Sequence, residues 1–185
     1  MTDVTVMACF DNETNKKLMD YRIELSKILK EELAGSWIPH ITLGCYELSD
    51  NKIKELINWV EYLSSKTKVI DFSFNSIGTF LHNEKYPKTD VIYAAPTIPK
   101  GLYELYCNYH MKFDEYSSKV GEDYSMINGQ PTIHSTITIC NKNEYEKAID
   151  FIWKKFEPMN SRIKDIKIYK MNKELIKSVN LRGVD

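Results

Sequence analysis

The feature that most constrains this chain is a short pattern, His-x-Thr followed by an apolar residue, which occurs twice. The first copy is His40–Leu43 (HITL) and the second is His134–Ile137 (HSTI). Both copies lie in runs where β-branched and apolar residues alternate with others, as is typical of β-strands. Because residues i and i+2 share one face of a strand, each copy places an imidazole beside a hydroxyl, with apolar neighbours facing a core. One copy alone would fit an ordinary strand with a polar face, but two copies in matching contexts favour a shared site.

The same alternation continues each polar face beyond its motif. Tyr46 falls on the face of His40 and Thr42. Thr138 falls on the face of His134 and Thr136, and Ile139 falls on the opposite face. We therefore expect Tyr46 and Thr138 on the same faces as the two motifs.

The elements predicted around the two motifs recur in one order: strand, helix, histidine strand, helix, strand. We expect them at 4–10, 14–33, 39–47, 50–65 and 69–81, then at 91–97, 99–116, around the second motif, 144–156 and 163–169, with a final strand at 175–181. Asp11 or Asn12 can cap the first helix, and Gly35 follows its predicted end. No linker rich in Gly, Pro or Ser separates the halves. We therefore predict one α+β domain, 1–185, with pseudo-repeats of about 1–81 and 91–185.

Two such halves can meet with their polar sheet faces across a central cleft, which would bring His40 and His134 opposite each other. An imidazole titrates near neutral pH, so one histidine can activate an attacking oxygen while the other protonates a leaving oxygen. Thr42 and Thr136 can donate hydrogen bonds to the non-bridging oxygens of a phosphate. The sequence leaves open which histidine is the acid and which is the base.

Composition excludes several other classes. The 185 residues carry a net charge of −1 with a pI of about 6.4, so a general nucleic-acid coat, which needs a strong basic excess, is not expected. No apolar run has the length of a membrane span, and the N-terminus does not resemble a signal peptide, so we expect a cytoplasmic protein without membrane contact. His-Glu-x-x-His, Walker and Gly-x-Gly-x-x-Gly motifs are absent, so no metal or other cofactor is expected.

The four cysteines are predicted to be reduced thiols rather than a zinc site. They are Cys9, Cys45, Cys107 and Cys140, and no pair of them has Cys-x-x-Cys spacing. Three of the four lie in predicted strands, where burial is the expected role of a free cysteine.

The two motifs resemble the paired His-x-Thr/Ser-hydrophobic motifs of the 2H phosphoesterase superfamily. The resemblance is greatest to its bacterial branch, called 2′-5′ RNA ligase-like or cyclic phosphodiesterase-like, and the repeated element order extends it over most of the chain. It implies a bilobed, pseudo-symmetric α+β fold with antiparallel sheets and a central cleft. It also implies metal-independent action on 2′,3′-cyclic phosphates or 2′-5′ phosphodiester bonds. The second motif departs from the pattern, since Pro131 stands three places before His134 rather than next to it.

Carried over to this sequence, the resemblance implies His40 and His134 as catalytic residues and Thr42 and Thr136 as phosphate-binding residues. The expected partner is a nucleotide or RNA terminus with a cyclic phosphate or a 2′-5′ linkage, bound by a monomer. The alternatives are a non-catalytic nucleotide or RNA-end binding module with the same cleft, and a cleft that serves as a partner interface. Tyr46 can stack on a base, or it can merely cover the rim at a strand end.

Other residues could contribute to the cleft from outside the motifs. The loops 83–90 and 117–130 are candidates for substrate-specific rims, because loops on a rigid scaffold commonly carry specificity. His82 is interpreted as a loop residue and His110 as a structural residue within a helix. The aromatic residues that could line the cleft are Phe80, Tyr86, Tyr93 and Tyr124.

Overall fold

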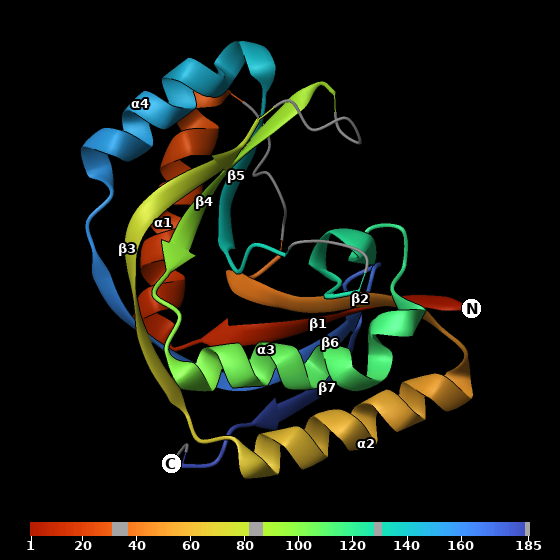
Figure 1. Cartoon of the computed structure of the whole chain (residues 1–185). Helices are drawn as coiled ribbons and strands as arrows, with labels where there is room; N and C mark the ends of the chain where they lie inside the picture. The colour runs from red at the N-terminus through yellow and green to blue at the C-terminus, as the bar shows by residue number, and fades with distance from the viewer. Residues whose placement is uncertain (31–36, 82–86, 128–130, 184–185) are drawn as a thin grey trace.

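The computed structural model describes residues 1–30, 37–81, 87–127 and 131–183. Within these ranges the chain forms an antiparallel sheet of seven strands with four α-helices, so the predicted α+β class is confirmed (Figure 1). The first half contains β1 (Thr2–Phe10), α1 (Asn12–Leu29), β2 (His40–Leu48), α2 (Asp50–Lys66) and β3 (Ile70–Phe80). The second half contains β4 (Thr89–Pro96), α3 (Lys100–Phe113), β5 (Ser135–Asn141), α4 (Tyr145–Lys155) and β6 (Met159–Lys170), followed by β7 (Leu175–Asn180). The predicted order of elements therefore occurs in both halves.

The strands form one continuous sheet in the order β2-β1-β6-β3-β4-β5, with β7 paired to β6. If β1, β2 and β3 are matched to β4, β5 and β6, this order reads the same from either end. Each half therefore adds its last strand to the strands of the other half. β6, from the second half, pairs with β1, and β3, from the first half, pairs with β4. The two histidine strands are the two ends of the path, so they are not paired to each other within the sheet.

The helices also exchange between the halves. Figure 1 shows α1 beside α4 and α3 beside α2, and α1 contacts β5 whereas α3 contacts β2. The first helix of each half thus packs against the histidine strand of the other half. Side chains on α1 can consequently reach the second motif, which is far away in the sequence.

Local sequence explains where the first helices begin and end. Asp11 is the N-cap of α1 and accepts a hydrogen bond from the backbone N–H of Thr14 at 2.9 Å. Ser49 caps α2 in the same way, through the N–H of Lys52. The predicted end of α1 at residue 33 is wrong, because Lys30 takes a left-handed conformation with φ of 54° and stops the helix after Leu29. Gly35 lies outside the described residues.

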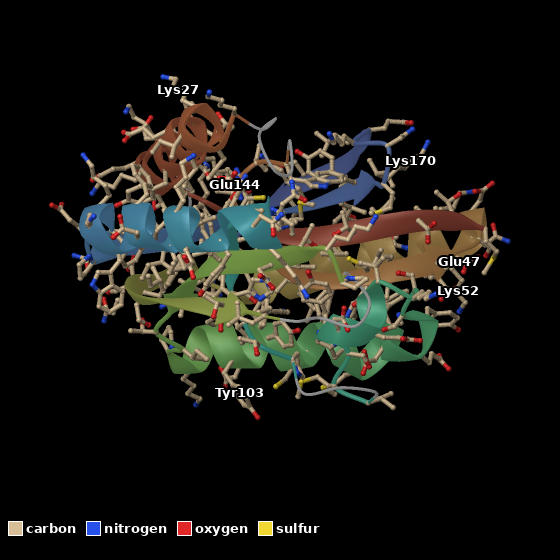
Figure 2. The ribbon with its side chains drawn as sticks, turned by 90° about the horizontal axis from the view of Figure 1, so that it is seen from above. Lys27, Glu47, Lys52, Tyr103, Glu144 and Lys170 are labelled. Carbon is tan, nitrogen blue, oxygen red and sulfur yellow. The ribbon has the colours of Figure 1, made fainter. Side chains whose placement is uncertain are left out.

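The core and the surface follow the expected polarity. Every residue of β1 from Val4 to Phe10 is buried, on both faces of the strand. Figure 2 shows Lys27 and Tyr103 projecting outward from separate elements. Within the described ranges, no helix combines the length and the apolar character that crossing a membrane requires. Cys9, Cys45, Cys107 and Cys140 are all free, and all except Cys107 are buried, as the sequence predicts.

Candidate active site

Both motifs line a single cleft of about 470 Å³. His40 and Thr42 come from β2, and His134 and Thr136 come from the segment that enters and begins β5. The cleft thus lies between the two ends of the sheet, where the twisted path brings β2 and β5 close to each other. The structure brings together all four motif residues that the sequence singled out.

The two imidazoles are held by the same type of hydrogen bond. Nδ1 of His40 lies 2.6 Å from the carbonyl oxygen of Ile38, and Nδ1 of His134 lies 2.7 Å from that of Thr132. A carbonyl oxygen can only accept, so Nδ1 carries the proton in both rings. When neutral, each ring therefore has its free lone pair on Nε2. Nε2 can take up a proton as a base or, once protonated, donate it as an acid.

Thr42 extends the hydrogen-bond network of His40. Its Oγ1 lies 3.1 Å from Nε2 of His40, so the hydroxyl can donate to the neutral ring. Burial lowers the pKa of His40 to about 4, opposed by the Ile38 carbonyl. The positive charge of Arg22, and that of His134 whenever its ring is protonated, lower this pKa further. Burial also lowers the pKa of His134 from its ordinary value, opposed by the Thr132 carbonyl. Both rings are therefore neutral in the free protein at pH 7.

The surroundings of His134 are aromatic. Its ring lies 5.0 Å from Phe80 and 5.1 Å from Tyr93 between centroids, and it stacks on Tyr124 at 6.1 Å. Phe80 and Tyr124 also line the cleft. The sequence nominated these three aromatic residues, whereas Tyr86 and His82 lie outside the described residues. The result is an asymmetric cleft, with rings around His134 and polar groups around His40.

The interpretation of Tyr46 as a base-stacking residue is wrong. A β-bulge lies between the pairs Val6–Gly44 and Met7–Thr42, so Leu43 is an extra residue in β2. A bulge reverses the alternation beyond it. Cys45 therefore lines the cleft, whereas Tyr46 is 0% exposed and packs its ring 5.9 Å from Phe113 in the core. A fully buried ring cannot stack on a substrate base.

The second motif contains the same irregularity at the matching position. The register of β4 and β5 shifts between the pairs Ile92–Thr138 and Tyr93–Thr136, which leaves Ile137 as the extra residue. Thr138 is consequently buried and Ile139 lines the cleft, the reverse of the prediction. Both His-x-Thr motifs are thus followed at once by a bulged apolar residue, so the two halves match in detail.

Arg22 is a cleft residue that the sequence analysis missed. It lies on α1, four residues after Leu18 and three before Leu25, and all three side chains are buried. Its Nη1 donates to the carbonyl of Trp37 at 2.5 Å, and its Nη2 donates to that of Thr136 at 2.6 Å. The available signal was the position of an arginine within the apolar stripe of a helix, because an arginine is rarely buried unless its side chain has partners.

The segment after α3 forms one rim of the cleft. It contains the short turns η1 (Asp114–Tyr116) and η2 (Gly121–Tyr124), and Val120, Asp123 and Tyr124 line the cleft. Asp114 anchors the segment, since it accepts from the N–H of Ile127 at 2.7 Å and pairs with the buried His110 at 2.9 Å. His110 is therefore structural, as predicted. The predicted rim role of 117–130 agrees with these positions, and residues 128–130 lie outside the described residues. In the other predicted rim, 83–90, residues 83–86 lie outside the described residues and Thr89 lines the cleft.

The architecture is similar to that of solved structures, although no family model and no curated protein matches the sequence. TT0787 of Thermus thermophilus superposes with a TM-score of 0.66 at 13% identity, covering 99% of this chain and 100% of that one. E. coli LigT in complex with 3′-AMP gives 0.67 at 12% identity, with coverage of 98% and 99%. The chain has a LigT-like fold.

Two further structures share this LigT-like fold. A protein described as a phosphoesterase gives a TM-score of 0.62 at 12% identity, covering 98% of this chain and 99% of that one. Usb1 of Kluyveromyces marxianus gives 0.52 at 8% identity, with 97% of each chain covered. These neighbours are members of the 2H phosphoesterase superfamily, so the resemblance indicated by the two motifs is confirmed at the level of the fold.

The cleft has the components of acid–base chemistry on a phosphate. The two Nε2 atoms can accept a proton from a substrate or donate one to it, and the threonine hydroxyls can donate hydrogen bonds to phosphate oxygens. Arg22 supplies a positive charge. In the ranges that the structure describes, no group of three or more His, Cys, Asp or Glu side chains is arranged to hold a metal ion.

Proposed function

We propose that this protein is a phosphoesterase that acts on 2′,3′-cyclic phosphates or 2′-5′ phosphodiester bonds, in RNA ends or small nucleotides. The observation that carries the proposal is the pair of His-x-Thr motifs in one cleft, each with Nδ1 held by a carbonyl. The LigT-like fold supports phosphoesterase chemistry in general. The particular substrate is the part of the proposal that experiment must decide.

The chemistry requires an in-line displacement at phosphorus. One Nε2 takes the proton of the attacking oxygen while a bond forms from that oxygen to phosphorus. The opposite bond to the leaving oxygen breaks, and Nε2–H of the other histidine protonates that oxygen. The hydroxyls of Thr42 and Thr136 stabilise the charge that builds up on the non-bridging oxygens. The two histidines exchange protonation states in the reaction, and the reverse direction exchanges their roles.

A nucleotide is the class of partner that the neighbours favour. LigT has been crystallised with 3′-AMP, with NADP+ and with ATP. In this chain, Phe80 and Tyr124 present aromatic surface to the cleft, and aromatic side chains stack on bases regardless of sequence. The net charge of −1 favours one or two nucleotides over a long RNA.

The rival proposal is a nucleotide-binding module that uses the same cleft without catalysis. The deciding experiment incubates the protein with a 2′,3′-cyclic nucleotide, a 2′-5′ dinucleotide and a matched 3′-5′ dinucleotide, and separates the products by chromatography. Cleavage of the cyclic nucleotide or the 2′-5′ dinucleotide, with the 3′-5′ isomer left intact, supports the phosphoesterase. Saturable binding of the same compounds without any product would instead support the binding module.

The pH dependence of kcat/KM follows from the two histidines. Activity needs one neutral and one protonated imidazole, so kcat/KM is highest between their two pKa values. Since the pKa of His40 is lowered to about 4 and that of His134 lies below its ordinary value, we expect a bell with its maximum on the acid side of pH 6.5. A bound anionic substrate favours the protonated form of both rings and so raises their pKa values. The pH profile of kcat should therefore have its maximum at higher pH than that of kcat/KM. Measuring both profiles checks this, and a kcat/KM maximum above about pH 7.5 would contradict it.

A further inference from the structure

Arg22 links the segment just before β2 to β5 without belonging to either histidine strand. β2 and β5 are the two ends of the sheet path and share no ladder. The guanidinium of Arg22 donates to the carbonyl of Trp37, three residues before His40, and to the carbonyl of Thr136, two residues after His134. A planar guanidinium with fixed donors holds two acceptors at a defined separation. The side chain therefore ties the backbone just before His40 to the backbone just after His134.

Arg22 also brings a positive charge to the cleft. The side chain lines the cleft and the residue is 5% exposed, but no carboxylate of the described residues pairs with it. Its Nε is buried and has no hydrogen-bond partner among the residues that the structure describes. Burial lowers the pKa of Arg22 to about 10, so the group stays protonated at neutral pH. Because a buried cation without a counterion is costly, an anion in the cleft would be stabilised.

The charge acts unequally on the two histidines. Arg22 opposes protonation of His40, whereas the ring of His134 is surrounded mainly by aromatic side chains. The other titratable groups that line the cleft are Cys45 from β2, Asp123 and Tyr124 from η2, and the two histidines themselves. Of the described residues that line the cleft, Arg22 is the one whose side chain stays positively charged at neutral pH.

We propose that Arg22 is a positioning residue for the phosphate reaction: it sets the separation of the two motif histidines and places a positive charge beside the phosphate between them. The inference rests on the proposed function, because it assumes that a phosphate occupies the cleft. Arg22 moves no proton in this account. It acts through the positions and charges of His40 and His134, and through the electrostatic attraction of the substrate.

The test compares Arg22→Lys and Arg22→Met with Lys27→Met. Lysine keeps the charge, but its ammonium cannot hold both carbonyls in the forked geometry, whereas methionine removes both the charge and the fork. Lys27 lies on the same helix and points outward, so its replacement controls for losing a cation from α1 (Figure 2). The readouts are kcat and KM, the affinity for inorganic phosphate, the titration midpoints of the histidines by NMR, and Tm.

For Arg22→Lys we expect a phosphate affinity within about threefold of wild type and a kcat lower by about 10–100-fold, the cost of misplacing reacting groups. For Arg22→Met we expect phosphate to bind about tenfold more weakly or worse, and the His40 midpoint to rise by about one pH unit, more than that of His134. Lys27→Met should leave all four readouts unchanged.

Variants that match wild type in kcat, phosphate affinity and histidine titration would overturn the proposal, even if their Tm falls, because Arg22 would then be purely structural. If Arg22→Met does not fold, an unchanged kcat in Arg22→Lys is by itself enough to overturn the proposal. Phosphate binding and histidine titration need no turnover. A wild-type protein that binds phosphate but cleaves none of the substrates would therefore contradict the proposed function. Phosphate binding and histidine titration would still test the role of Arg22.

Discussion

Replacing His40 or His134 with alanine is expected to lower kcat by about 10²–10⁴-fold, the usual contribution of one general acid or base. Each Nε2 is held at the cleft through its Nδ1 hydrogen bond to a carbonyl, so each ring is poised for proton transfer. The double variant should lose little more than either single variant, because the two groups act as one unit. Steady-state kinetics on a substrate of the wild-type protein, together with Tm, would measure these effects.

Asparagine at the same positions provides the matched control. Its side-chain amide can keep the hydrogen bond to the carbonyl of Ile38 or Thr132 but cannot transfer a proton near neutral pH. His40→Asn and His134→Asn should therefore recover any stability lost in the alanine variants while remaining inactive. Recovery of activity in the asparagine variants would mean that the histidines only support the fold.

The second large effect is expected at Gly121. A Cβ on this residue would lie 1.9 Å from the carbonyl oxygen of Cys45, so alanine forces the η2 turn away from β2. The same carbonyl accepts a hydrogen bond from the N–H of Ser118, which holds the turn against the strand. Gly121→Ala should lower the free energy of unfolding by about 1–3 kcal/mol, as is usual for overpacking, and should raise KM by moving Tyr124. Chemical denaturation and kinetics would measure both.

Gly101→Ala is the control for this steric argument. Gly101 lies in α3, and among the described residues a Cβ there would meet Ile70 alone, at 3.7 Å, which is an ordinary contact. Since alanine is the better helix former, this variant should be at least as stable as the wild type. A destabilised Gly101→Ala, or a Gly121→Ala variant with unchanged stability and KM, would contradict the packing described around η2.

The sequence predicted the elements of the fold and the position of the motifs because both depend on local patterns. The apolar periodicity of α1 and the alternation within β2 and β5 are visible along the chain. The pairing of β6 with β1 is not visible, because it joins strands from opposite ends of the chain, and the pairing of β3 with β4 crosses from one half to the other. The repeated order therefore predicted two halves without showing how they interlock.

The residues missed or misplaced in the cleft have identifiable causes. Tyr46 and Thr138 were assigned to the wrong face because a bulge at Leu43 and another at Ile137 reverse the alternation, and no residue type in the sequence marks them. Arg22 was missed because its role depends on carbonyls of Trp37 and Thr136, and backbone groups leave no trace in the residue sequence. Side-chain chemistry was thus predictable at the motifs, whereas its supporting geometry was not.

The most direct test of the two-histidine account is cleavage of the cyclic nucleotide and the 2′-5′ dinucleotide by protein that has been treated with EDTA and kept in it. The two imidazoles and the threonine hydroxyls provide the acid, the base and the phosphate donors, so no step requires a metal ion. The account predicts that at least one of the two substrates is cleaved at a rate unchanged by EDTA. Cleavage of neither substrate, or cleavage that stops in EDTA and returns with Zn²⁺ or Mg²⁺, would contradict it.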